Sequence, residues 1–233
     1  KRNIVKSLAK ASSVLAPLGR VIGDFFSAKL RKLLEAKDNF SVSETVDAEQ
    51  TVAQLFSQAE ELKKQDDLAA AEKKYIEIIS LDSKNIKAFK ELGHIYFAKK
   101  EFEEAKQTFE HILKLKQDEY IYADLAQIAK EKGNLTEARD GYLKSIKINK
   151  QNAETHFNLS EVFRAMSQWK EASASLKKAL KLEPANPRYL DSMLEISIII
   201  KDKALALDAY AKLLKANPEN QKLEEFKRQI DEL

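Results

Sequence analysis

The chain has 233 residues, of which 44% are hydrophobic, 33% are charged and only 8% are aromatic, with five glycines and four prolines. So few helix breakers among so many charged residues predict an almost entirely α-helical protein with enough apolar residues to form a core. The lack of cysteine excludes disulfides and thiolate chemistry, and a net charge of +3 excludes an overall basic nucleic-acid-binding protein. No apolar run approaches eighteen residues, so no membrane-spanning helix is predicted within the chain.

Residues 1–37 are predicted to form a basic amphipathic helical region. They hold nine Lys or Arg against Asp24 and Glu35. Apolar residues recur at helical spacing on either side of Pro17, with basic residues between them. These positions are Ile4, Leu8, Ala11, Leu15, Ile22, Phe25, Phe26, Leu30, Leu33 and Leu34.

Three interpretations of residues 4–36 remain open. The segment could cover the open edge of the first structural repeat, attach to an anionic membrane surface, or self-associate with another copy of the chain. Because the chain begins with Lys1 rather than Met, we expect an upstream stretch in the native protein. If that stretch is a membrane helix, the basic residues beside it place this chain in the cytoplasm, at the inner face of the membrane.

Residues 38–51 are predicted to be an exposed acidic linker. This stretch carries Asp38, Glu44, Asp47 and Glu49 and no basic residue. It also lacks the apolar spacing that either a helix or a strand needs.

From residue 52 onward an alanine recurs at nearly constant intervals of 34, 33, 34 and 34 residues. The five positions are Ala71, Ala105, Ala138, Ala172 and Ala206. Four residues after each alanine stands a large side chain, in the order Tyr75, Phe109, Tyr142, Leu176 and Tyr210. A fixed period in this range is typical of a stack of two-helix units, in which a small residue lies where helices cross closely.

One window carries further positions of this pattern. Phe89 is followed three residues later by Leu92-Gly93, then by Tyr96, and later by Ala105 and Phe109. Here the sequence resembles the tetratricopeptide repeat (TPR) family. The resemblance implies an all-α, right-handed superhelical solenoid with five helix-turn-helix repeats over residues 52–220. The repeat bounds are 52–85, 86–118, 119–152, 153–186 and 187–220.

On this frame each repeat holds two antiparallel helices. First helices are expected near 52–65, 86–99, 119–132, 153–166 and 187–200. Second helices are expected near 68–81, 102–115, 135–148, 169–182 and 203–216. Residues 221–233 are predicted to form a C-terminal capping helix, because Leu223, Phe226 and Ile230 share one face between charged residues.

The sequence offers no constellation for catalysis. Glu91-Leu92-Gly93-His94 has the E-x-x-H spacing of half a carboxylate di-iron site, but no second such motif exists and packing accounts for the glycine. His156 shares its frame position with apolar residues of the other repeats, so we expect it to be packed, whereas His111 is expected to be solvated. We therefore predict that the protein is not an enzyme and has no catalytic, cofactor or metal site.

The TPR resemblance implies that the first helices line a concave groove that binds a peptide or helix of a partner protein. We predict a scaffold or adaptor, with apolar anchors along the groove and charged residues setting the register. A membrane-surface or self-assembling protein attached through residues 4–36 is the alternative. The residues carried over to the groove are Phe56, Lys87, Lys90, His94, Phe97, Tyr120, Asp124, Gln127, Phe157, Asn158, Glu161, Arg164, Arg188, Ile198 and Ile199.

Overall fold

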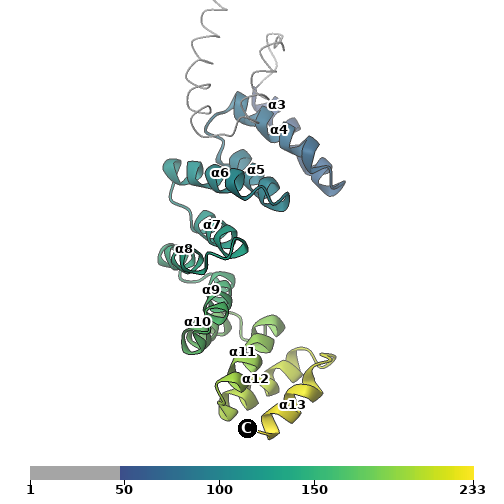
Figure 1. Ribbon diagram of the computed structural model, residues 1–233. Helices are drawn as coiled ribbons and strands as arrows, with labels where there is room; N and C mark the ends of the chain where they lie inside the picture. The colour runs from purple at the N-terminus through teal and green to yellow at the C-terminus, as the bar shows by residue number, and fades with distance from the viewer. Residues whose placement is uncertain (1–47) are drawn as a thin grey trace, which may run out of the picture. The chain divides into compact units, whose positions relative to one another are not determined.

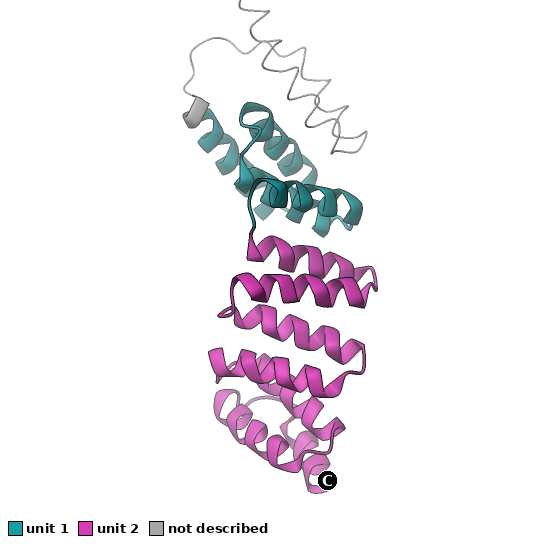
Figure 2. Ribbon diagram, turned by 90° about the vertical axis from the view of Figure 1, so that its left-hand side faces the viewer, with its two compact units in different colours: residues 1–117 teal, residues 118–233 magenta. Residues whose placement is uncertain are grey.

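Helices follow one another in hairpins throughout residues 48–233, the part of the chain that the computed structural model describes. The predictions for residues 1–37 and for most of the linker lie outside this range. The chain divides into two compact units, one ending at Gln117 and the other beginning at Asp118 (Figure 2). Each unit is described by itself.

The described part of the first unit contains two helical hairpins. Its helices are α3 (Ala48–Lys64), α4 (Leu68–Leu81), α5 (Ile86–Ala98) and α6 (Phe102–Leu115). Each packs against the next along the chain (Figure 1). α3 begins four residues before the predicted start at 52, within the stretch expected to be linker.

The second unit contains three hairpins and a final helix. Its helices are α7 (Glu119–Glu131), α8 (Leu135–Ile148), α9 (Ala153–Ala165), α10 (Trp169–Leu182), α11 (Pro187–Ile199), α12 (Lys203–Ala216) and α13 (Leu223–Asp231). Successive hairpins pack through α8 on α9 and α10 on α11, and α13 packs on α12 and α11. α13 confirms the predicted C-terminal helix, and its apolar residues Leu223, Phe226 and Ile230 are buried.

The helix starts follow from local hydrogen bonding. Side chains of Asp67, Asn85, Asp118, Asn152, Asn186 and Asp202 accept hydrogen bonds from backbone N–H groups of the first turn that follows them. These N–H groups have no partner inside the helix, so the caps stabilise the helix ends. Within each hairpin the turn places one residue in the left-handed region, at Asp66, Lys100, Gly133, Ser167 and Lys201.

The repeating alanines form the centre of the packing. All five have no exposed surface. The large residue four positions later is buried in the first four repeats, whereas Tyr210 of the last repeat is half-buried. Gly93 shows why small residues are needed, because a Cβ atom there would lie 2.5 Å from Cε1 of Phe109.

The structure confirms the expectation for one histidine, His156, and contradicts the expectation for the other, His111. His156 is buried as expected, with Nε2 lying 3.1 Å from the Lys150 carbonyl oxygen. The expectation that His111 is solvated is wrong. Its side chain is buried, and its ring lies 4.6 Å from that of Phe89, because this position of the second helix faces the first helix of its own hairpin.

Candidate interaction surface

In the second unit, charged side chains join the first helices α9 and α11. Arg188 of α11 forms an ion pair of 3.0 Å with Glu154 of α9, and the Tyr189 hydroxyl donates to the same carboxylate at 3.0 Å. Burial and this carboxylate raise the pKa of Tyr189, so the hydroxyl stays protonated as a donor. These contacts bring the predicted binding residue Arg188 against the preceding repeat.

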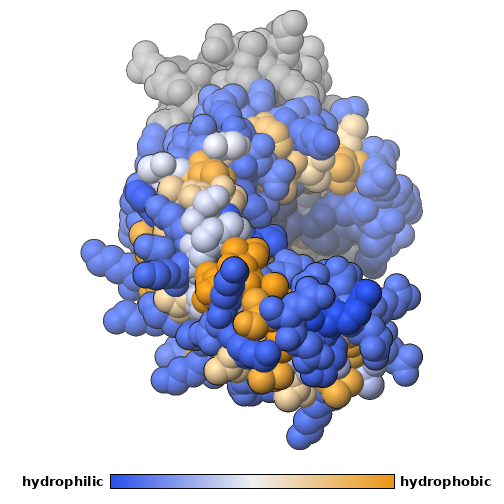
Figure 3. Space-filling view, turned by 60° about the horizontal axis from the view of Figure 1, so that its bottom comes forward, coloured by the Kyte–Doolittle hydropathy of each residue, from blue (hydrophilic) through white to orange (hydrophobic). Residues whose placement is uncertain are grey.

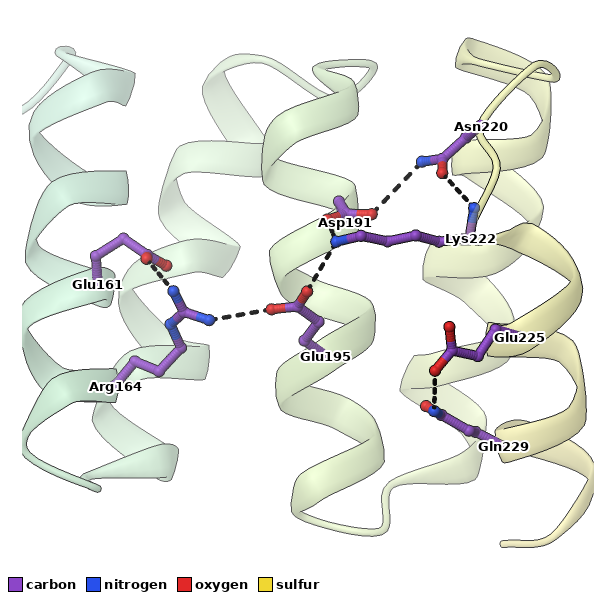
Figure 4. Close-up of polar contacts among 8 residues, drawn as sticks. All are labelled: Glu161, Arg164, Asp191, Glu195, Asn220, Lys222, Glu225 and Gln229. Carbon is purple, nitrogen blue, oxygen red and sulfur yellow. Dashed lines mark hydrogen bonds and ion pairs between the residues drawn. The ribbon is translucent and has the colours of Figure 1, made fainter.

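A second set of ion pairs continues along the same helices (Figure 4). Arg164 of α9 lies between Glu161 at 2.5 Å and Glu195 of α11 at 3.0 Å. Lys222, just before α13, reaches Asp191 at 3.0 Å and Glu195 at 3.1 Å. The hydrogen bonds that Lys222 donates to Asp191 and Glu195 raise its pKa.

Together these pairs define what we call the first-helix face of the second unit, formed by α9 and α11 and continued by Lys222. Each pair is partly exposed and contributes on the order of 1 kcal/mol or less to stability. Their consequence for binding is larger, because most charges of α9 and α11 already have a partner within the protein. A ligand on this face would therefore meet paired charges rather than a strong field of one sign.

Phe157 does not lie where the sequence prediction placed it. It was expected to be an accessible apolar anchor, but only 3% of its surface is exposed. Its ring stacks on Tyr189 at 4.8 Å with an interplanar angle of 20°, and the Arg188 guanidinium lies 4.1 Å above it. Residues of the next repeat thus cover this position, which the single-repeat frame could not indicate.

The other apolar residues predicted here are more accessible. Tyr120 is 50% and Ile199 is 49% exposed, while Ile198 packs partly on the core of the second unit. On the side drawn in Figure 3 the surface is mainly hydrophilic, with apolar residues gathered in local patches. Of the apolar residues predicted for the groove, Tyr120 and Ile199 thus remain accessible as separate anchors.

Three polar residues of the prediction lie beside the hairpin interior. Gln127 accepts a hydrogen bond of 2.8 Å from the Tyr142 hydroxyl and donates one of 2.8 Å to Glu131. Asp124 and Asn158 are half-buried. Burial raises the pKa of Tyr142, so its hydroxyl remains a donor that fixes the Gln127 amide.

The first unit has a similar link between first helices. Lys63 of α3 forms an ion pair of 2.6 Å with Glu91 of α5. The Tyr75 hydroxyl donates to Glu60 at 2.5 Å, and this bond, with Lys63 nearby, lowers the pKa of Glu60. Glu60 and Gln127 occupy the same frame position, so a tyrosine of the second helix orients a polar residue of the first helix in both units.

Most of the binding residues predicted in the first unit contact an aromatic ring. Lys87 lies with Nζ 4.5 Å from the ring centroid of Phe56. The His94 ring lies 5.5 Å from Phe109, and the Phe97 ring lies 5.8 Å from that of Phe102. Phe56, Lys90, His94 and Phe97 are each half-buried.

Two contributors escaped the sequence prediction. Lys222 lies in the cap segment, outside the five repeats from which the groove positions were selected. Extending the repeat period into this segment could have indicated its pairing with two carboxylates. The tyrosine hydroxyls were treated as packing residues only. Their signal is a tyrosine fifteen residues after a polar residue of the first helix, as in Glu60–Tyr75 and Gln127–Tyr142.

The described residues offer no group of three or more His, Cys, Asp or Glu side chains that could hold a metal ion. Within the same range, each helix is too short or too polar to cross a membrane. The arrangement described above consists of paired charges, oriented amides and separate apolar side chains, the kinds of group that interaction surfaces contain.

Consecutive helical hairpins with this packing define a repeat protein of the solenoid class. Family models described as tetratricopeptide repeat match residues 62–128, 120–152 and 153–186, which together exceed half of the chain. The chain therefore belongs to the tetratricopeptide repeat family.

Two curated relatives share part of this region. Hsp70-Hsp90 organizing protein 1 of Glycine max is 27% identical over 149 residues, covering 61% of this chain and 24% of the relative. Tetratricopeptide repeat-containing protein trd-1 of Caenorhabditis elegans is 26% identical over 137 residues, covering 58% of this chain and 18% of the relative. The chain thus spans about a quarter or less of the relatives it matches.

Solved structures show the same fold. YrrB, a TPR protein with an unusual peptide-binding site, matches with a TM-score of 0.61 and 16% identity, over 78% of this chain and 98% of YrrB. MamA from Desulfovibrio magneticus RS-1 matches with a TM-score of 0.64 and 12% identity, over 73% of this chain and 97% of that one. At these identities the likeness concerns the fold alone.

Proposed function

We propose that this protein is a non-catalytic scaffold that binds a peptide or helix of a partner protein on its first helices. The observation that carries the proposal is the set of ion pairs joining α9, α11 and the start of α13. These pairs make side chains of successive repeats one connected surface, as a ligand longer than one repeat requires. TPR family membership favours the same role.

The nature of the surface narrows the class of ligand. Since its charges are largely paired, affinity would come from apolar contacts at exposed positions such as Ile199 and from hydrogen bonds to half-buried amides such as Asn158. Charged residues of the ligand would set its register by exchanging partners with Arg188 or Lys222. A short amphipathic helix or extended segment fits this description better than a highly charged tail.

Site-specific photo-crosslinking tests the proposal directly. A benzoylphenylalanine residue is introduced at Asn158 or at Ile199 on the first helices, and in matched controls at Leu143 or Lys147 on the second helix α8. After irradiation in the native cell extract, discrete adducts should form from the first two positions only, and mass spectrometry would identify the partner. Adducts from α8 alone, or equal labelling at all four positions, would refute binding on the first helices.

Residues 4–36 support the alternative of a membrane-surface or self-assembling protein, because their sequence combines apolar spacing with a strong basic excess. Co-sedimentation with vesicles containing anionic lipid tests it. Binding that disappears when residues 1–37 are removed would favour attachment through this segment. No binding by the full chain would eliminate it.

A further inference from the structure

The second unit carries opposite charge on its two sets of helices. First helices α7, α9 and α11 each have an excess of acidic residues, with three acids to one base in α7 and two to one in α9 and α11. Second helices show the reverse, with four lysines to one acid in α10 and three to one in α12. In the first unit this separation does not occur, because α4 has two acids and two bases and α6 has an acidic excess.

A cleft of about 290 Å³, lined by both apolar and charged side chains, lies between the two most basic helices. Its floor is formed by Leu190 and Met193 of α11 and by Ala209 of α12, all nearly fully buried, and Leu180 and Leu205 line its sides. This volume is below the range of about 300–1,000 Å³ usual for small-molecule sites. The cleft is therefore suited to one large apolar side chain.

Lysines surround the opening. Lys177 and Lys181 lie one turn apart on α10, and Lys212 lies across from them on α12. Lys212 pairs with Asp208 at 2.6 Å, whereas neither α10 lysine has an ion pair with any other residue of the described chain. A ligand that places an apolar side chain in the cleft and carboxylates beside it would thus meet two available cations.

The chain itself contains a segment with this chemistry. Residues 38–47 carry Asp38, Glu44 and Asp47 without any base, and they include one large apolar side chain, Phe40. The segment directly precedes α3 in the first unit, whereas the cleft belongs to the last two hairpins of the second unit. This cleft is also separate from the first-helix face proposed to bind a partner protein.

We propose that residues 38–47 of one copy bind the α10–α12 cleft of a second copy. Phe40 enters the apolar floor, and the acidic residues pair with Lys177 and Lys181. Because the two surfaces differ, this contact is head-to-tail, and it leaves a free cleft on the copy that supplies the segment and a free segment on the other copy. The full chain associates in a concentration-dependent manner, and the association weakens as salt screens the charge pairs.

Sedimentation velocity of the full chain, at increasing concentration and in low salt, measures the association. The double variant Lys177→Glu/Lys181→Glu and the double variant Asp38→Lys/Glu44→Lys should each weaken it at least tenfold. Mixing these two variants should restore it, because both charge patterns are reversed together. Phe40→Ala should weaken it without any change of charge.

The matched control is Lys147→Glu/Lys215→Glu, which makes the same charge change on second helices outside the cleft and should associate like the parent chain. Circular dichroism of every variant checks that the fold is kept. A parent chain that stays monomeric at all concentrations, an equal loss in the control, or failure of the mixed variants to associate would overturn the proposal. So would association with anionic vesicles, but not with a second copy, that depends on Lys177 and Lys181. Crosslinking at Asn158 is unaffected in either case, so the proposed partner binding is tested separately.

Discussion

At the scale of single residues, each hairpin turn needs a left-handed residue, but only one repeat uses glycine there. Gly133 has φ of +78°, and Ser167 adopts φ of +58° at the same position of the next repeat. A side chain in this region costs about 1–2 kcal/mol, partly offset by the larger entropy that glycine loses on folding. We expect Ser167→Gly to raise the free energy of unfolding by about 0.5–1 kcal/mol and Gly133→Ala to lower it by about 1 kcal/mol, measured in urea. Shifts of the same sign in both variants would contradict this account.

His156 makes stability depend on pH. Burial lowers its pKa below the ordinary 6.5, more strongly than the Lys150 carbonyl raises it. As pH falls below about 6.5 the unfolded chain binds a proton that the folded chain does not, so the free energy of unfolding decreases. His156→Leu, which copies Leu190 of the next repeat, should reduce this decrease between pH 7.5 and 5.5. Part of the decrease should remain in this variant, because burial also lowers the pKa of His111. Equal pH dependence in variant and parent would be evidence against the assignment.

Phe157 shows the limit of reading a binding site from a repeat frame. The frame indicates which helix face a residue occupies, but its exposure depends on what the next repeat places above it. Because Arg188 and Tyr189 cover Phe157, we expect Phe157→Ala to lower the free energy of unfolding by about 3–5 kcal/mol. Ile199→Ala, at a position that is 49% exposed, should change it by less than about 0.5 kcal/mol. Thermal melts of the two variants provide the comparison.

At the scale of elements, the sequence predicted nine of the ten hairpin helices to within one residue at each end. This accuracy has a physical cause, since the alanine period, the capping Asp and Asn residues and the turns all indicate the same boundaries. α3 was predicted too short because its first turn lacks apolar residues with helical spacing. Links between repeats, such as Arg164–Glu195, were not predicted, because they join residues 31 positions apart whose side-chain directions depend on how the hairpins stack.

The Arg164–Glu195 ion pair connects α9 and α11 across a distance of 3.0 Å, with both side chains about one-third exposed. A double-mutant cycle with Arg164→Ala and Glu195→Ala should give a coupling free energy of about 0.3–1 kcal/mol, because water screens the pair. The coupling should shrink in 1 M NaCl. A coupling unaffected by salt would indicate that packing of the Arg164 side chain, rather than charge, holds the two helices together.

At the scale of the whole molecule, a repeat protein is stabilised by contacts between neighbours, so loss of a terminal helix should weaken the adjacent hairpin most. Deleting residues 223–233 removes Leu223, Phe226 and Ile230, each worth roughly 1.5–3 kcal/mol when buried, and exposes their partners on α11 and α12. We expect amide hydrogen exchange to accelerate by several orders of magnitude in α11 and α12, and far less in α8 and α9.

The matched control for this deletion is Glu225→Ala/Gln229→Ala, which removes an exposed hydrogen bond of 3.1 Å between two residues of α13 (Figure 4). This variant should exchange like the parent chain, since the buried residues of α13 are kept. Uniform acceleration from α7 to α12 in the deletion would instead mean that the second unit opens as one cooperative body. In that case the stability of the second unit would not be a sum over contacts between neighbouring hairpins. A destabilising substitution in one of its three hairpins would then affect the other two as well.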